Sequence, residues 1–187
     1  VETFESIVHP CKNVLEAIRI LGIDLKYFNA SSSDCFGDSK NRHTENSEIK
    51  PVSPYGMSKS TTNLIVKSYR ESYGIFACNG ILFNHESERR GETFVTQKIA
   101  LSAARIAQGM QKELVLGNLD AIRDWGYAPE YGDGMWRMLQ HNTPDDYVLA
   151  TNTGYSVRDF LKFAFDTVNL EWEKFVKFDK RYERPTE

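Results

Sequence analysis

The sequence predicts an α/β fold built on a parallel sheet. Two apolar runs, 25–30 and 75–83, have the length of strands, and a helical segment of 19 residues separates them. A further helix precedes the first run, and helices and strands go on alternating as far as residue 168. Strands joined through helices lie parallel in one sheet, so this alternation favours the α/β class.

Each element follows from a local signal. Apolar residues at 4, 7, 8, 11, 14, 15 and 18 have helical spacing, and Gly22 and Gly74 end the first two helices. Ser156 and Asp159 form a capping box that opens the last helix. The expected elements, in chain order, are helix 4–21, strand 25–30, a polar loop 31–54, helix 55–73, strand 75–83, a charged loop 84–92, helix 94–108, strand 114–116, helix 127–141, strand 147–150 and helix 157–168.

Composition excludes several classes of function. The 187 residues carry a net charge of −3, which gives no electrostatic reason to expect binding to nucleic acid or to an anionic membrane. No apolar run approaches the length of a membrane-spanning helix. Three widely spaced cysteines, Cys11, Cys35 and Cys78, form no CxxC pair, so we expect reduced thiols and a cytoplasmic protein.

Tyr55 and Lys59 form the first candidate catalytic pair. They lie four residues apart and so share one face of the predicted helix 55–73. A lysine ammonium beside a phenol stabilises the phenolate, which lets a tyrosine act as a base near neutral pH. The YxxxK pattern alone is weak and more often marks a tyrosine and a lysine that merely face solvent on one helix. Its setting favours chemistry, because a serine-rich strand end precedes it and another strand follows.

This layout resembles the short-chain dehydrogenase/reductases, and longer segments are similar to the GDP-mannose 4,6-dehydratases. These segments are NASSSDCFG at 29–37, SPYGMSK at 53–59, YRESYG at 69–74, NGILFNHES at 79–87, FVTQKI at 94–99, GNLDAIRDWG at 117–126 and RPTE at 184–187. The resemblance implies a Rossmann-type, doubly wound parallel sheet. Residues 1–93 would form the later part of the dinucleotide-binding domain, and residues 94–187 a substrate-binding region with some Rossmann elements.

The glycine-rich turn that holds a dinucleotide pyrophosphate does not occur in the sequence. The chain also opens inside a predicted helix, and its last residues read as cut rather than finished. We therefore expect it to lack the N-terminal half of the fold.

The resemblance implies roles for four residues. Tyr55 would take the proton of the sugar 4-hydroxyl, Lys59 would tune Tyr55 and bind the nicotinamide ribose, and Ser32 would bind O4. Asp34 stands where these dehydratases carry glutamate, the carboxylate that removes the C5 proton and assists loss of the 6-hydroxyl as water. The product would be GDP-4-dehydro-6-deoxy-mannose, with transient reduction of NADP.

Further residues match positions that bind the two ligands in the family. His85 and Arg90, with Lys59, would contact NADP; residues that choose NADP over NAD are not in this sequence. Positions implied for GDP-mannose are Asn84, Lys98, Asn118, Arg123, Arg184 and Glu187. The family also implies a homo-oligomer, a dimer or a tetramer. His85 and Glu86 alone make no ligand set, so we predict no metal site.

Two alternatives stay open. An NAD(P)-dependent epimerase or reductase acting on a nucleotide sugar would share Tyr55, Lys59 and Ser32 but would need no carboxylate at position 34. The shorter side chain of Asp34 could also slow elimination, since catalytic geometry is sensitive at the level of ~1 Å. The second alternative is an inactive fragment, because without the glycine-rich turn the cofactor pyrophosphate has no helix N-terminus to bind.

Overall fold

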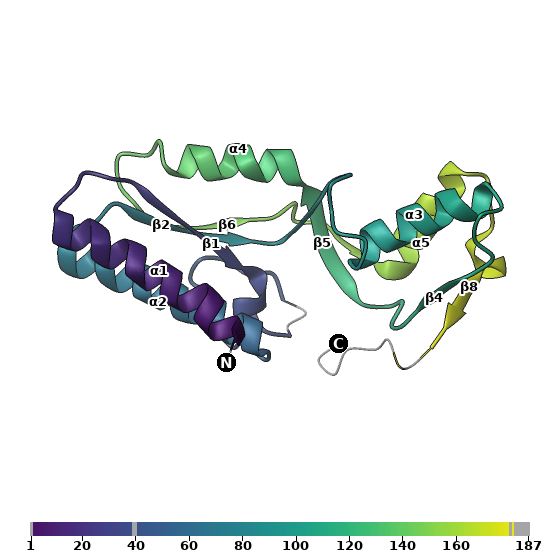
Figure 1. Cartoon of the computed structure of the whole chain (residues 1–187), viewed down its shortest axis with the longest axis horizontal. Coiled ribbons are helices and arrows are strands. Elements are labelled where there is room, and N and C mark those ends of the chain that lie inside the picture. Colours follow the sequence, from purple (N-terminus) through teal and green to yellow (C-terminus); the bar gives the residue numbers. More distant parts are fainter. Residues whose placement is uncertain (1, 39–40, 180, 182–187) are drawn as a thin grey trace. The chain divides into compact units, whose positions relative to one another are not determined.

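The chain divides into two compact units, each made of two segments (Figure 1). The computed structural model describes residues 2–38, 41–179 and 181. The first unit contains residues 1–85 and 128–150, and the second contains residues 86–127 and 151–187. Contacts within each unit therefore join parts of the chain that are far apart in sequence.

The first unit is a three-layer α/β structure. Its sheet has the order β1-β2-β6, formed by β1 (Tyr27–Ser32), β2 (Ala77–Leu82) and β6 (Asp146–Leu149), and both strand pairs are parallel. Helices α1 (Glu2–Leu21) and α2 (Pro54–Tyr73) cover one face, and α4 (Ala128–Met138) covers the other (Figure 1). The predicted α/β class with a parallel sheet covered on both faces is confirmed.

Local chemistry sets the ends of α2. The Ser53 side chain accepts a hydrogen bond from the Gly56 N–H at 3.0 Å, and Pro54 occupies the first turn, where a missing N–H costs nothing. Gly74 ends the helix in the left-handed conformation, with φ of 66°. The first catalytic candidate, Tyr55, therefore stands in a turn with a defined start.

The core of the first unit lies between its helices and the sheet. Leu15 and Ile18 of α1 pack against Val66 of α2 and against Ala77 at the start of β2. All six residues of β2 are buried, which explains why this segment reads as a nearly continuous apolar run.

The second unit packs α3 (Val95–Ala107) against α5 (Val157–Thr167) around a core that includes Ile99, Leu161 and Phe165, all fully buried. Strands β4 (Leu114–Leu116) and β8 (Val176–Phe178) form a parallel pair beside them, and a short 3₁₀ helix, η2 (Trp172–Lys174), lies between α5 and β8. The predicted capping box at Ser156 is confirmed.

Strand β5 (Ile122–Tyr127) pairs with β7 (Gly154–Ser156) in the second unit, and this pair is antiparallel. The expectation of parallel strands throughout was therefore wrong here. The sequence also provides no signal for β3 (Asn84–Glu86), β5, β7 and β8. These strands are short, and β5, for example, has no buried residue, so they carry little hydrophobic signal.

One strand boundary also needs correction. The first strand was expected at 25–30, but β1 begins at Tyr27 and ends at Ser32, so Ser31 and Ser32 belong to the strand and not to the following loop. After β1 the chain turns at once into a short 3₁₀ helix, η1 (Ser33–Phe36). The remaining helices and strands lie within two or three residues of their expected ends.

None of the described helices combines the length and apolar character needed to cross a membrane.

The division predicted at residue 93 concerned function, with the cofactor-binding part before it and the substrate-binding part after it. The two compact units follow contacts instead, and the functional division stays a prediction.

Candidate active site

Tyr55 and Lys59 lie in the first two turns of α2, beside the carboxyl end of β1. The Lys59 ammonium donates a hydrogen bond of 2.7 Å to the Ala30 carbonyl, and its Nζ is 5.6 Å from the centre of the Tyr55 ring. Burial lowers the pKa of Lys59, and the nearby Cys11 opposes this effect. The Tyr55 side chain is 41% exposed, so a substrate can approach it.

Ser32 is the last residue of β1, and Asp34 lies in the 3₁₀ helix η1 that follows it. The Ser32 hydroxyl accepts a hydrogen bond of 3.2 Å from the Asp34 N–H and so caps η1. Asp34 is in the first turn of η1, and its side chain is exposed. The backbone N–H of Asp34 therefore takes part in the capped turn, while its exposed carboxylate can still contact a ligand.

A close backbone approach joins this turn to α2. A Cβ atom added to Gly56 would lie 2.6 Å from the Asp34 carbonyl oxygen and 3.3 Å from Cβ of Pro51. Only glycine allows the start of α2 to lie this near to η1. Together with the bond from Lys59 to Ala30, this contact brings the predicted residues Ser32, Asp34, Tyr55 and Lys59 into one region. Gly56 was not singled out from the sequence.

His85 and Asn84 follow β2. The His85 Nδ1 atom is 2.8 Å from the Phe83 carbonyl, which can only accept, so Nδ1 carries the proton and Nε2 is left for a ligand. The ring stacks on Tyr131 of α4 at a centroid distance of 4.7 Å. Asn84 is half-buried at the start of β3.

Arg90 lies in the second unit, near the start of α3. Its guanidinium carbon is 3.6 Å from the centre of the Phe94 ring, and its Nε is 3.3 Å from Glu86 Oε2. That ion pair lacks the alignment of a hydrogen bond, so the buried Nε–H has no hydrogen-bond acceptor among the described residues. Such a group can donate to an anionic ligand.

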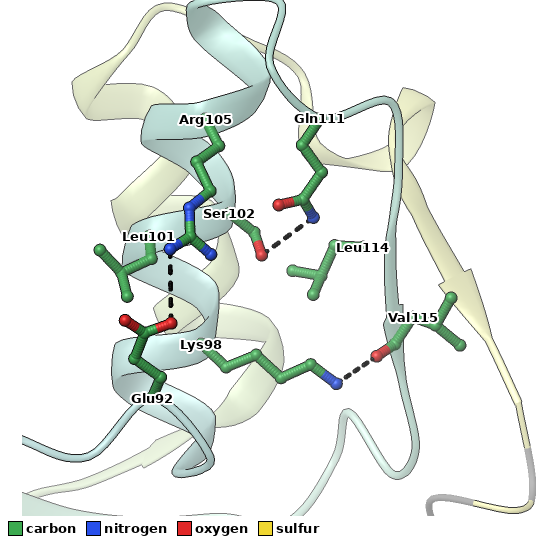
Figure 2. Close-up of a pocket in the computed structure, with 8 residues that line it drawn as sticks. All are labelled: Glu92, Lys98, Leu101, Ser102, Arg105, Gln111, Leu114 and Val115. Carbon is green, nitrogen blue, oxygen red and sulfur yellow. Dashed lines mark hydrogen bonds and ion pairs between the residues drawn. The ribbon is translucent and has the colours of Figure 1, made fainter.

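Lys98 borders a pocket of about 290 Å³ between α3 and β4 (Figure 2). Its ammonium donates to the Val115 carbonyl at 2.8 Å. Arg105 pairs with Glu92 at 3.3 Å on the α3 side of the pocket, and Gln111 donates to Ser102. The pocket therefore combines two cations and one carboxylate with apolar walls from Leu101 and Leu114.

The remaining predicted substrate residues fall in two groups. Asn118 and Arg123 belong to the second unit, where the Asn118 side chain accepts from the Asp120 N–H and the Arg123 guanidinium donates to the Ile122 carbonyl. Arg184 and Glu187 lie outside the described residues. Trp125 lies beside Phe160 at a centroid distance of 5.4 Å, and both pack against the core of the second unit.

The sequence matches a known protein family over its whole given length. The sequence model described as GDP-mannose 4,6 dehydratase matches residues 1–187. This chain belongs to the GDP-mannose 4,6-dehydratase family. It is 49% identical over 178 residues to GDP-mannose 4,6 dehydratase 1 of Arabidopsis thaliana, covering 93% of this chain and 49% of that protein. It is 51% identical over 154 residues to the GDP-mannose 4,6-dehydratase of Vibrio cholerae, covering 81% and 41%. The chain thus spans about half the length of these curated relatives.

Solved structures confirm the fold of this family member. The protein RMD from Pseudomonas aeruginosa, in complex with NADPH, superposes with a TM-score of 0.86 at 22% identity over 94% of this chain and 60% of that one. A dTDP-glucose 4,6-dehydratase from Bacillus anthracis, in complex with NAD, gives 0.84 at 16% identity over 94% and 56%.

Proposed function

We propose that the protein dehydrates GDP-mannose to GDP-4-dehydro-6-deoxy-mannose with no net change in oxidation state. The observation that carries the proposal is the meeting of Tyr55 and Lys59 with Ser32 and Asp34 at the end of β1. This arrangement offers a phenol, a cation, a hydroxyl and a carboxylate, which the reaction needs. Membership of the family supports the choice of substrate.

Oxidation at C4 would use Tyr55, Lys59 and Ser32. Tyr55 takes the proton of the sugar 4-hydroxyl as the carbinol becomes a ketone. The Lys59 ammonium, held by the Ala30 carbonyl, favours the phenolate form of the tyrosine through its positive charge. Ser32 donates a hydrogen bond to O4 while its own oxygen still accepts from the Asp34 N–H.

Elimination would use Asp34. A ketone at C4 acidifies the C5 proton, and the exposed Asp34 carboxylate can remove it as a base. The same carboxyl group then gives a proton to the departing 6-hydroxyl, which leaves as water. Aspartate is one methylene shorter than the family's glutamate. Gly56 allows α2 to approach the Asp34 backbone closely, and this contact sets the backbone position from which the carboxyl group extends.

Residues of this chain fit a nicotinamide cofactor, which we propose to be NADP. Lys59 would bind its ribose, the free Nε2 of His85 would accept a hydrogen bond, and the buried Nε–H of Arg90 would donate to an anionic group. When bound, the cofactor would supply reversible hydride transfer between its nicotinamide and the sugar carbons C4 and C6. The similar solved structures hold NADPH in one case and NAD in another, so the choice of NADP follows the family resemblance alone.

The second unit would hold the GDP part of the substrate. Lys98 and Arg123 would supply positive charge for the diphosphate, and Asn118 would add a polar contact. Asn84, which lies in the first unit, is kept only from the family pattern. The proposal retains Arg184 and Glu187 from the family pattern, with the arginine on phosphate and the glutamate on the ribose hydroxyls.

Incubation of the protein with GDP-mannose and NADP tests the reaction. We expect a product with the absorbance of a 4-keto sugar in alkali and the mass of the substrate less one water. A product of unchanged mass would favour the epimerase alternative, and net oxidation or reduction of the cofactor would favour a reductase. No product from protein that binds both ligands would refute catalysis.

We also propose a cellular location and an oligomeric state for the whole protein. All three cysteines are free and buried, which supports a reducing, cytoplasmic setting. The family implies a homo-oligomer, and light scattering coupled to size-exclusion chromatography should give the mass of a dimer or a tetramer. A monomer mass at micromolar concentration would contradict this.

A further inference from the structure

A row of three polar residues crosses the sheet of the first unit at one level. Asn29 of β1, Asn79 of β2 and Asp146 of β6 are in register with one another. The Asn29 amide donates to the Asn79 oxygen at 2.8 Å, and the Asn79 amide donates to Asp146 at 2.8 Å. Asn29 and Asn79 are 6% and 0% exposed, so the bond between them forms away from water, whereas the bond to Asp146 is only partly buried. We call these three residues the polar row.

Helix α2 is attached to the polar row at several points. Asn29 donates to the Thr62 hydroxyl at 3.2 Å, and Asn79 donates to the Asn63 carbonyl at 3.1 Å. Arg70, two turns further along α2, donates to Asp146 at 2.9 Å. Apolar packing is non-directional, whereas buried hydrogen bonds have narrow geometry. These bonds therefore fix how far α2 can slide along the sheet.

Hydrogen bonds hold both the backbone carbonyl and the side-chain ammonium of Lys59, and both lead to the same part of β1. The Thr62 hydroxyl, held by Asn29, donates to the Lys59 carbonyl at 2.8 Å. The Lys59 ammonium reaches the carbonyl of Ala30, the residue next to Asn29. One short segment of β1 thus sets both the backbone and the side-chain end of the lysine.

We propose that Thr62, oriented by Asn29, is a positioning residue for Lys59. It touches neither the substrate nor the cofactor, and it acts by keeping the Lys59 ammonium on the Ala30 carbonyl beside Tyr55. The catalytic consequence rests on the proposed dehydratase function, whereas the effect on Lys59 itself does not.

Thr62→Val tests the proposal, because valine keeps the shape of threonine and removes its hydroxyl. Thr61→Val is the matched control: the Thr61 hydroxyl makes the same kind of bond, to the Met57 carbonyl at 2.8 Å, but among the described residues it makes no hydrogen bond to the polar row. Thr62→Ser should restore the wild-type behaviour, since it keeps the hydroxyl. If Thr62→Val does not fold, Thr62→Cys replaces it, because a thiol is only a weak donor.

The first measurement is the pKa of the Lys59 ammonium, followed by ¹⁵N NMR and assigned with Lys59→Arg. We expect its lowered pKa to rise toward the ordinary lysine value in Thr62→Val, because the ammonium leaves its half-buried position for water. In Thr61→Val and Thr62→Ser it should stay at the wild-type value. An unchanged Lys59 pKa in folded Thr62→Val would overturn the proposal, whether or not the protein proves to be a dehydratase.

The second measurement is the rate of GDP-mannose dehydration. Misplacement of a catalytic group by ~1 Å can cost ~100-fold in rate, so we expect kcat of Thr62→Val to fall by about 10- to 100-fold with KM little changed. An equal loss in Thr61→Val would show a general effect on α2 and count against the proposal. Absence of dehydration in the wild-type protein would instead refute the proposed function and leave the NMR result standing.

Discussion

Gly56→Ala should move Tyr55, at the start of α2, away from Asp34 in η1. The added Cβ would lie 2.6 Å from the Asp34 carbonyl oxygen, a backbone atom that has no free rotation with which to escape. Restoring ordinary contact at 3.4 Å requires a movement of about 0.8 Å between the start of α2 and η1. The residues on either side of that movement are Tyr55 and Asp34.

Two energies oppose each other in this variant. Forcing a methyl group into a filled site costs roughly 1–3 kcal/mol, whereas alanine gains up to about 1 kcal/mol over glycine in a helix. We therefore expect a net loss of up to about 2 kcal/mol in the free energy of unfolding. A displacement near 1 Å predicts a loss of up to ~100-fold in kcat.

Urea unfolding and the dehydration rate would be measured together, with Gly132→Ala as the control. Gly132 is also helical, in α4, and a Cβ added there meets nothing within 4 Å, so this variant should be as stable as the wild type or more so, and fully active. If Gly56→Ala is as stable and as active as Gly132→Ala, the close approach between α2 and η1 contributes to neither stability nor catalysis.

Three further changes have defined outcomes. Asp34→Asn should stop elimination but leave exchange of hydride between C4 and the cofactor, as followed by isotope transfer from labelled substrate; survival of elimination would refute the role of Asp34. Glu16 accepts hydrogen bonds from Arg19 and from Tyr69, which lower the pKa of its carboxyl group from 4.5 to about 2. Its contribution to stability is thus present above pH 4.5 and lost as the pH falls toward 2, so Glu16→Gln should show a shallower fall of Tm across that interval, and an identical profile would contradict the assignment. Ser156→Ala removes the cap of α5 and should cost about 1 kcal/mol in urea unfolding, whereas no change would mean that the capping box is not needed.

Part of the site could be predicted from local sequence. The helical spacing of Tyr55 and Lys59, the cap at Ser53 and the stop at Gly74 all depend on residues within one or two helical turns. The α/β class followed in the same way from runs of apolar residues. Such signals are readable because the interactions behind them join neighbours in the chain.

Other features depend on residues that meet only after folding. Strands β5 and β7 are held by bonds to each other across about 30 residues, and neither carries an apolar pattern that would reveal it. The partner of Lys59, the Ala30 carbonyl, precedes it by 29 residues. A carbonyl group is present in every residue, so no sequence pattern could single that one out.

The pair Tyr55 and Lys59 was thus determined by the sequence, whereas its environment was decided by the tertiary structure. Asn29 and Asn79 are polar residues within two mostly apolar strands, and they meet in the polar row because parallel pairing sets them in register. Gly56 looked like an ordinary helix residue until η1 lay against it. Burial and close contact are properties of the packed chain, since they exist only where distant segments exclude water together.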